Sequence, residues 1–277
     1  MTYGKLLACA FAAMGLVSIP RQVSAIDRLT DDEVKKLFDT IEHDRSEFEA
    51  ALDDKQKNTT IKGARGEVNA NEFFDDFEDQ VQRTRDRFKS DYSASSEVLS
   101  LLQYSTRLQA WTATQPAGFP GSKQWGVLSN DLRRLAAAYN TALPNPGQQG
   151  LGTVAQARRI NDAELVTAAE NVEKKIDGFR TAYSSALSAN TNITPEMRQA
   201  AIGQVDATKK NAQALNAALA KKQEGVPEAE ALLKGTRAIV DTIAKLPPSS
   251  PAAGSWTPLR DDLAIVALAY EVPASLK

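Results

Sequence analysis

A short phrase occurs twice in this sequence, and the repetition constrains the fold more than any other feature. "KQWGVLSNDLRRLAAAY" begins at Lys123 and "GSWTPLRDDLAIVALAY" begins at Gly254, so the two are related by a 131-residue offset. The same offset relates pairs within the phrase, such as Leu128 and Leu259, Asp131 and Asp262, and Tyr139 and Tyr270, and pairs upstream of it, such as Phe48 and Phe179, and Arg28 and Arg159. Self-similarity at a fixed spacing indicates a structural repeat. The sequence therefore predicts an internal duplication.

The duplication predicts the domain organisation. The first copy covers residues 26–146 and the second covers residues 157–277. A linker at residues 147–156 joins them, and it overlaps the Pro- and Gly-rich stretch "LPNPGQQGLG", which begins at Leu143. A chain of 277 residues is long enough for two domains that each bury a core.

Residues 1–25 have the features of a secretory signal peptide. Lys5 precedes the apolar run "LLACAFAAMGLV", and "VSA" provides small residues for cleavage after Ala25. The apolar run is too short to span a bilayer, so we expect a secreted or periplasmic protein; an uncleaved membrane anchor is the alternative. The single cysteine, Cys9, lies in this segment. The mature chain would therefore have no disulfide and no thiol chemistry.

Each copy is predicted to contain four helices. Apolar residues of the first segment recur with the helical period of 3.6, at Val34, Leu37, Phe38, Ile41, Phe48 and Leu52. Thr30 with Glu33 forms a capping-box pattern, and Asn161 with Glu164 occupies the matching place in the second copy. Alternation with period 2 is nearly absent, and "DDKQKNTTIKGARG" is expected to be a loop. The predicted fold class is all-α, with two tandem up-down four-helix bundles after a signal peptide.

The repeated phrase is predicted to form the closing helix of each bundle. Its apolar residues step by three and four residues, which is the stripe that a bundle helix turns inward. The candidate structural or binding residues of the phrase are Trp125, Asp131, Tyr139, Trp256, Asp262 and Tyr270. The two aspartates border the buried stripe and need partners there. We expect Asp131 to pair with Arg107, and Asp262 with Arg237, which would join the third and fourth helices.

The residue inventory argues against the common chemistries of helical bundles. Haem needs axial His, Met or Cys ligands, and di-iron sites need Glu-x-x-His on two helices. The mature chain offers one histidine, His43, and one methionine, Met197, in different copies. We therefore predict no catalytic residue, no metal and no cofactor. The net charge of −2 gives no reason to expect binding to nucleic acid or to a membrane surface after signal cleavage.

Two hypotheses of function remain besides an enzyme, which would need clustered polar groups with perturbed pKa values. The first is an exported, non-enzymatic helical-bundle binding or scaffold protein that uses the surface between or along the bundles. The alternative is a periplasmic sensor or chaperone-like module that holds a small apolar ligand or unfolded chains, and it requires an apolar pocket or an exposed apolar groove. The partner, a protein or a small apolar ligand, is not specified by any motif.

Overall fold

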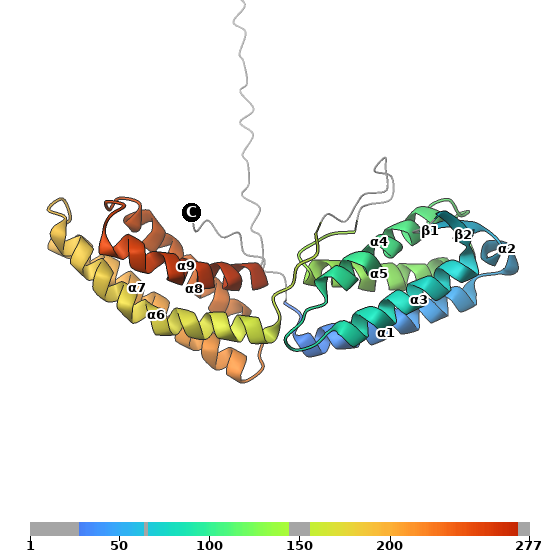
Figure 1. The fold of residues 1–277 in the computed structure, drawn as a ribbon, viewed down its shortest axis with the longest axis horizontal. Helices are drawn as coiled ribbons and strands as arrows, with labels where there is room; N and C mark the ends of the chain where they lie inside the picture. Colours follow the sequence, from blue (N-terminus) through green and yellow to red (C-terminus); the bar gives the residue numbers. More distant parts are fainter. Residues whose placement is uncertain (1–27, 64–65, 144–155, 271–277) are drawn as a thin grey trace, which may run out of the picture.

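A computed structural model describes residues 28–63, 66–143 and 156–270 (Figure 1). The expected signal peptide at 1–25 and most of the expected linker at 147–156 lie outside these residues. The described chain is mostly helical, with nine helices and one two-stranded sheet. The all-α class is therefore confirmed. None of the described helices is both long enough and apolar enough to cross a membrane.

The described residues form an N-terminal half, residues 28–143, and a C-terminal half, residues 156–270, which Figure 1 shows as two groups of helices. The elements of the N-terminal half are α1 (Asp31–Ala51), α2 (Asp54–Lys57), β1 (Thr60–Gly63), β2 (Gly66–Asn69), α3 (Ala70–Arg87), α4 (Ser95–Thr112) and α5 (Ser122–Ala138). Those of the C-terminal half are α6 (Asp162–Ala189), α7 (Pro195–Ala220), α8 (Val226–Ile243) and α9 (Pro251–Ala269).

Side-chain caps define the starts of the first helix in each half. Thr30 and Glu33 form the predicted capping box, in which the Thr30 hydroxyl accepts from the Glu33 N–H and the Glu33 carboxylate accepts from the Thr30 N–H. The Asn161 side chain accepts from the Glu164 N–H at 2.7 Å. Each cap satisfies a backbone donor that the first turn leaves free. The caps fix where α1 and α6 begin. Each helix follows a short segment, and the two segments contact each other.

The segment between α1 and α3 differs from the predicted loop. It contains the one-turn helix α2 and an antiparallel hairpin in which Thr60 pairs with Asn69 and Gly63 with Gly66. Ile61 is the buried residue of β1, and the Trp111 indole N–H donates to the Thr59 hydroxyl at 2.9 Å. Each strand contains a single large apolar residue, Ile61 in β1 and Val68 in β2, which is too little alternation to predict a strand. The hairpin packs against α4, a contact that its own sequence does not reveal.

Each half encloses its own hydrophobic core. In the N-terminal half α1 and α4 each pack against α3 and α5, and in the C-terminal half α6 and α8 each pack against α7 and α9. The N-terminal core is rich in phenylalanine, with Phe38, Phe48, Phe73, Phe74, Phe77 and Phe88 all buried. The C-terminal core is richer in alanine, around Phe179, Tyr183 and Trp256. Among the described residues, no buried residue belongs to both cores, and only the partly buried Ala157 of the C-terminal half packs against the N-terminal core.

The repeated phrase forms α5 and α9 with the predicted stripe turned inward. Leu128, Leu132, Leu135 and Tyr139 are fully buried, as are Leu259, Leu263, Val266 and Tyr270 to within 1%. Trp125 lies against Phe48 with ring centroids 5.7 Å apart, and Trp256 lies against Phe179 at 5.4 Å. The two tryptophans therefore meet phenylalanines that are themselves related by the 131-residue offset.

Candidate functional site

The two halves meet through the short segments that precede α1 and α6. Arg28 Nη2 donates to the Ile160 carbonyl at 3.0 Å and forms an ion pair with Asp162 at 2.6 Å. Arg159 Nη2 donates to the Leu29 carbonyl at 2.6 Å and forms an ion pair with Asp31 at 2.8 Å. The segments "RLTD" and "RIND" thus make the same contacts on each other.

The two junction aspartates also cap each other's helices. The Asp31 N–H donates to Asp162 Oδ2 at 2.9 Å, and the Asp162 N–H donates to Asp31 Oδ2 at 3.1 Å. A carboxylate at a helix N-terminus is favoured by the helix dipole and by the free N–H groups of the first turn. Each carboxylate therefore makes two interactions with the opposite half: it pairs with an arginine, and it accepts a hydrogen bond from the first backbone N–H of a helix.

The junction arginines are almost completely withdrawn from solvent. The side chains of Arg28 and Arg159 are 4% and 2% exposed. Burial lowers the pKa of Arg159, and the neighbouring charge of Arg28 lowers it further, while the Asp31 carboxylate opposes both effects. The Nε atom of each guanidinium is buried without a hydrogen-bond partner. Buried charges of this kind are stable only as pairs, and removal of one partner typically costs about 3–5 kcal/mol.

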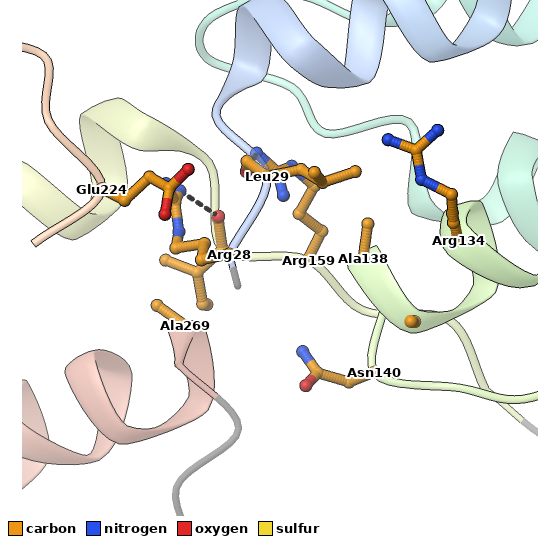
Figure 2. Close-up of a pocket in the computed structure, with 10 residues that line it drawn as sticks. Arg28, Leu29, Arg134, Ala138, Asn140, Arg159, Glu224 and Ala269 are labelled. Carbon is orange, nitrogen blue, oxygen red and sulfur yellow. Dashed lines mark hydrogen bonds between the residues drawn. The ribbon is translucent and has the colours of Figure 1, made fainter. Parts of the chain in front are cut away.

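A pocket of about 350 Å³ lies at this junction (Figure 2). It is lined by Arg28, Leu29, Arg134, Ala137, Ala138, Asn140, Arg159, Ile160, Glu224 and Ala269. The 131-residue offset relates three pairs of the lining, namely Arg28 with Arg159, Leu29 with Ile160, and Ala138 with Ala269. Figure 2 shows Glu224 beside Arg28 on one side and Arg134 on the other. The pocket therefore draws its walls from both halves.

Two buried tyrosines hold the loops beside the junction. The Tyr139 hydroxyl donates to the Ser93 carbonyl and the Tyr270 hydroxyl to the Glu224 carbonyl, each at 2.6 Å. Burial raises the pKa of Tyr139 well above its ordinary value and that of Tyr270 to about 12. Both phenols are therefore neutral donors at physiological pH. Since Glu224 lines the pocket, Tyr270 positions part of its wall from behind.

Asp131 and Asp262 face the first helix of their halves. Asp131 pairs with Arg134, three residues along α5, at 2.8 Å, and the predicted pairing with Arg107 is wrong. The Arg107 guanidinium instead lies over the Tyr104 ring, 5.3 Å from its centroid. The Asp131 carboxyl also has a side-chain hydrogen bond with Asp44 of α1, the helix on which α5 packs.

In the C-terminal half Asp262 has a cation from the neighbouring helix. It forms an ion pair with Lys175 of α6 at 2.5 Å and accepts from the Asn171 amide at 3.4 Å. The predicted bridge between the third and fourth helices is therefore replaced by one between α6 and α9. Asp44 corresponds to Lys175 by the 131-residue offset, so the N-terminal half has a carboxyl where the C-terminal half has this cation.

Asp44 and Asp131 form a carboxyl pair between α1 and α5. Burial, a side-chain hydrogen bond with Asp131 and the charge of Asp131 raise the pKa of Asp44 to about 6. Two ionised carboxylates are both acceptors, and Asp44 Oδ2 is buried with no donor in reach. The hydrogen bond between them therefore requires a proton on one of the two. Among the described residues, no group of three or more His, Cys, Asp or Glu side chains is placed to hold a metal ion.

None of the six candidate residues of the repeated phrase lines the junction pocket. Trp125, Trp256, Tyr139 and Tyr270 pack in the cores or against loops, and the two aspartates bridge helices within one half. Sequence reasoning missed the pocket residues, although the 131-residue offset between Arg28 and Arg159 was a visible signal. Comparison with known proteins finds no matching family model, no similar curated protein and no similar solved structure.

Proposed function

We propose that this chain is an exported, non-enzymatic binding or scaffold protein made of two tandem copies of an up-down four-helix bundle, and that it holds a small ligand between the copies. Several contacts support the duplication, because they recur at the same 131-residue offset. These are the Phe–Trp contacts within each core, the Tyr–carbonyl hydrogen bonds beside the junction, and the Arg–Asp pairs across it. The order in which the helices neighbour each other is also the same in both halves.

The junction pocket is the observation that carries the binding proposal. Ligand sites occur preferentially where two domains meet, and a volume of about 350 Å³ is at the small end of the range for such sites. The ion pairs of the buried Arg28 and Arg159 with Asp162 and Asp31 fix both walls, so the pocket exists before any ligand arrives. A pre-formed site avoids part of the ordering cost of binding.

The lining indicates the chemistry of the ligand. Leu29, Ile160 and three alanines provide apolar wall, while the Arg134 side chain is 55% exposed at one side. Glu224, on the opposite side in Figure 2, would repel an anionic group and direct it towards Arg134. The preferred ligand is therefore a small molecule with an apolar body and one carboxylate or similar anionic group.

The alternative of holding unfolded chains has less support in the described residues. Their exposed large hydrophobic side chains are Tyr92 between α3 and α4, Val127 in α5 and Met197 in α7. Chaperone-like capture requires a contiguous apolar surface. A small apolar ligand without a charge would use the same pocket, and the two ligand classes are separable by experiment.

The test compares benzoate with its neutral isostere benzamide by thermal unfolding of the full chain. At ten times its dissociation constant, a bound ligand stabilises the folded state by about 1.4 kcal/mol. We expect stabilisation by benzoate that exceeds stabilisation by benzamide. Equal stabilisation by both would favour the apolar-ligand alternative, and no stabilisation by either would contradict this ligand chemistry.

A pair of variants on α9 locates the binding. Ala269→Leu places a larger side chain in the pocket and should abolish the effect of benzoate. Ala264→Leu makes the same change on an exposed face of α9 and should preserve it. Equal benzoate binding in both variants would show that the ligand lies elsewhere.

A further inference from the structure

The contacts across the junction come in exchangeable pairs. Each interaction made by Arg28 or Asp31 on the C-terminal half has a counterpart made by Arg159 or Asp162 on the N-terminal half. The two backbone-to-carboxylate bonds are exchangeable in the same way. Contacts in which residue i of one side meets residue j of the other, and j meets i, are those of a two-fold dimer interface.

The two surfaces are also chemically the same. The pattern Arg, Leu or Ile, any residue, Asp occurs at residues 28–31 and again at 159–162. If a second copy of residues 28–31 stood in the place of residues 159–162, every ion pair and every backbone acceptor would be present. Arg28 would meet the aspartate of the other copy, and Asp31 would meet its arginine and its helix start.

We propose that the junction is a self-complementary interface, so that the N-terminal half binds a second copy of itself through the surface that it presents to the C-terminal half. The partner that this surface fits is a second copy of this chain. Within one molecule, covalent linkage raises the effective concentration of the C-terminal half, which therefore occupies the surface first. The inference depends on the proposed duplication but not on the ligand proposed for the pocket.

The chain path allows the two halves to be cut apart without breaking either core. The Arg158 N–H donates to the Tyr139 carbonyl at 2.9 Å, and the Asn140 amide donates to the Arg158 carbonyl at 3.0 Å. The chain therefore leaves the N-terminal half and returns at the same place. Ala157 lies on the C-terminal side of a cut within residues 147–152 and packs on the N-terminal core; the other described core residues all lie on the same side of the cut as their own core.

The experiment starts from the full, folded chain with a protease site inserted at residues 147–152. After cleavage the halves are separated by ion exchange, since the N-terminal half is the more acidic. Sedimentation equilibrium then measures the molar mass of the N-terminal half alone and of its mixture with the C-terminal half. We expect the N-terminal half alone to form dimers. A half that stays monomeric at concentrations where it binds the C-terminal half would overturn the proposal, as would a half that loses its helical structure on separation.

A single substitution gives a quantitative criterion. Asp31→Asn in the N-terminal half removes one ion pair from the mixed complex but two from the symmetric dimer. The factor by which the substitution weakens dimerisation should therefore be about the square of the factor by which it weakens binding to the C-terminal half. The matched control is Asp32→Asn, whose side chain is exposed and makes only a 3.9 Å contact with Lys35, and it should change neither affinity. Equal losses in both complexes would show that the dimer uses another surface.

Discussion

Replacement of Asp44 by lysine should stabilise the N-terminal half at neutral and alkaline pH. Position 44 corresponds by the 131-residue offset to Lys175, which forms an ion pair with Asp262. In the N-terminal half the same place holds a carboxyl group that faces Asp131. Asp44→Lys therefore introduces into the N-terminal half the ion pair that the C-terminal half already contains.

The raised pKa of Asp44 determines the direction of the pH dependence. Its folded-state pKa of about 6 exceeds the ordinary value of 3.8. A carboxyl group with a raised pKa stabilises the fold below about pH 4, where it is protonated in both states. That contribution is lost as the pH rises through about 6. The contribution of Asp44 to the free energy of unfolding should therefore be less favourable at pH 8 than at pH 5.

The magnitude follows from the shift and from the exposure of the group. A shift from 3.8 to about 6 corresponds to about 3 kcal/mol at full strength. Asp44 is only half-buried, so solvent screening reduces the contribution to about 1 kcal/mol. A new pair with Asp131 adds up to about 1 kcal/mol, limited by the existing pair with Arg134. Asp44→Lys should thus raise the free energy of unfolding by about 1–2 kcal/mol at pH 8.

Urea unfolding followed by tryptophan fluorescence measures this effect. Trp256 is the one tryptophan of the C-terminal half, so a Trp256→Phe background makes the fluorescence report the N-terminal half alone. Asp44→Asn is the matched control, because it removes the charge without adding a cation, and it should recover about half of the gain. Two results would contradict repulsion between Asp44 and Asp131: an Asp44→Lys variant no more stable than the wild type at pH 8, or an Asp44→Asn variant with the same pH dependence as the wild type.

Two further substitutions and one sequencing experiment test other predictions. Tyr139→Phe deprives the Ser93 carbonyl of its donor, and calorimetry should show a loss of about 1 kcal/mol or more in the free energy of unfolding. Gly225→Ala should cost more than about 1 kcal/mol, since Gly225 has φ +68° and a new Cβ would lie 2.9 Å from Leu215; an unchanged melting temperature would contradict this. N-terminal sequencing of exported protein should begin at Ile26, whereas an intact initiator methionine in the membrane fraction would favour the anchor.

The long helices could be predicted because their signals are local. A 3.6-residue period, a capping residue and the inward stripe of the repeated phrase all act within one helix. The prediction therefore succeeded at Thr30, at Asn161 and along α5 and α9. These features depend only on residues three or four positions apart, so the sequence alone reveals them.

The partners of Asp131 and the junction could not be predicted in the same way. An aspartate at the edge of a stripe faces one of two neighbouring helices, and its sequence position does not distinguish them. Arg134 on the same helix was available as a partner and satisfies the carboxylate at 2.8 Å. The junction required knowledge of which chain ends meet. The matching of Arg28 to Arg159 indicated a repeat, but only the structure brings these residues to opposite sides of one interface.

The pattern of matches and differences between the halves follows from where each residue makes its contacts. At the junction, Arg28 and Asp31 correspond to identical residue types, and a change on one side would leave a buried charge unpaired on the other. Asp44 interacts with Asp131 of its own half, so no contact across the junction requires position 44 to match position 175. A single chain also allows the walls of the junction pocket to differ, which a dimer of identical subunits does not. Arg134 lines the pocket, whereas the residue at the matching offset is Ile265. Arg134 therefore has no cationic counterpart at the matching position, and Glu224 lines the opposite side of the pocket, so the proposed anionic ligand would bind in one orientation.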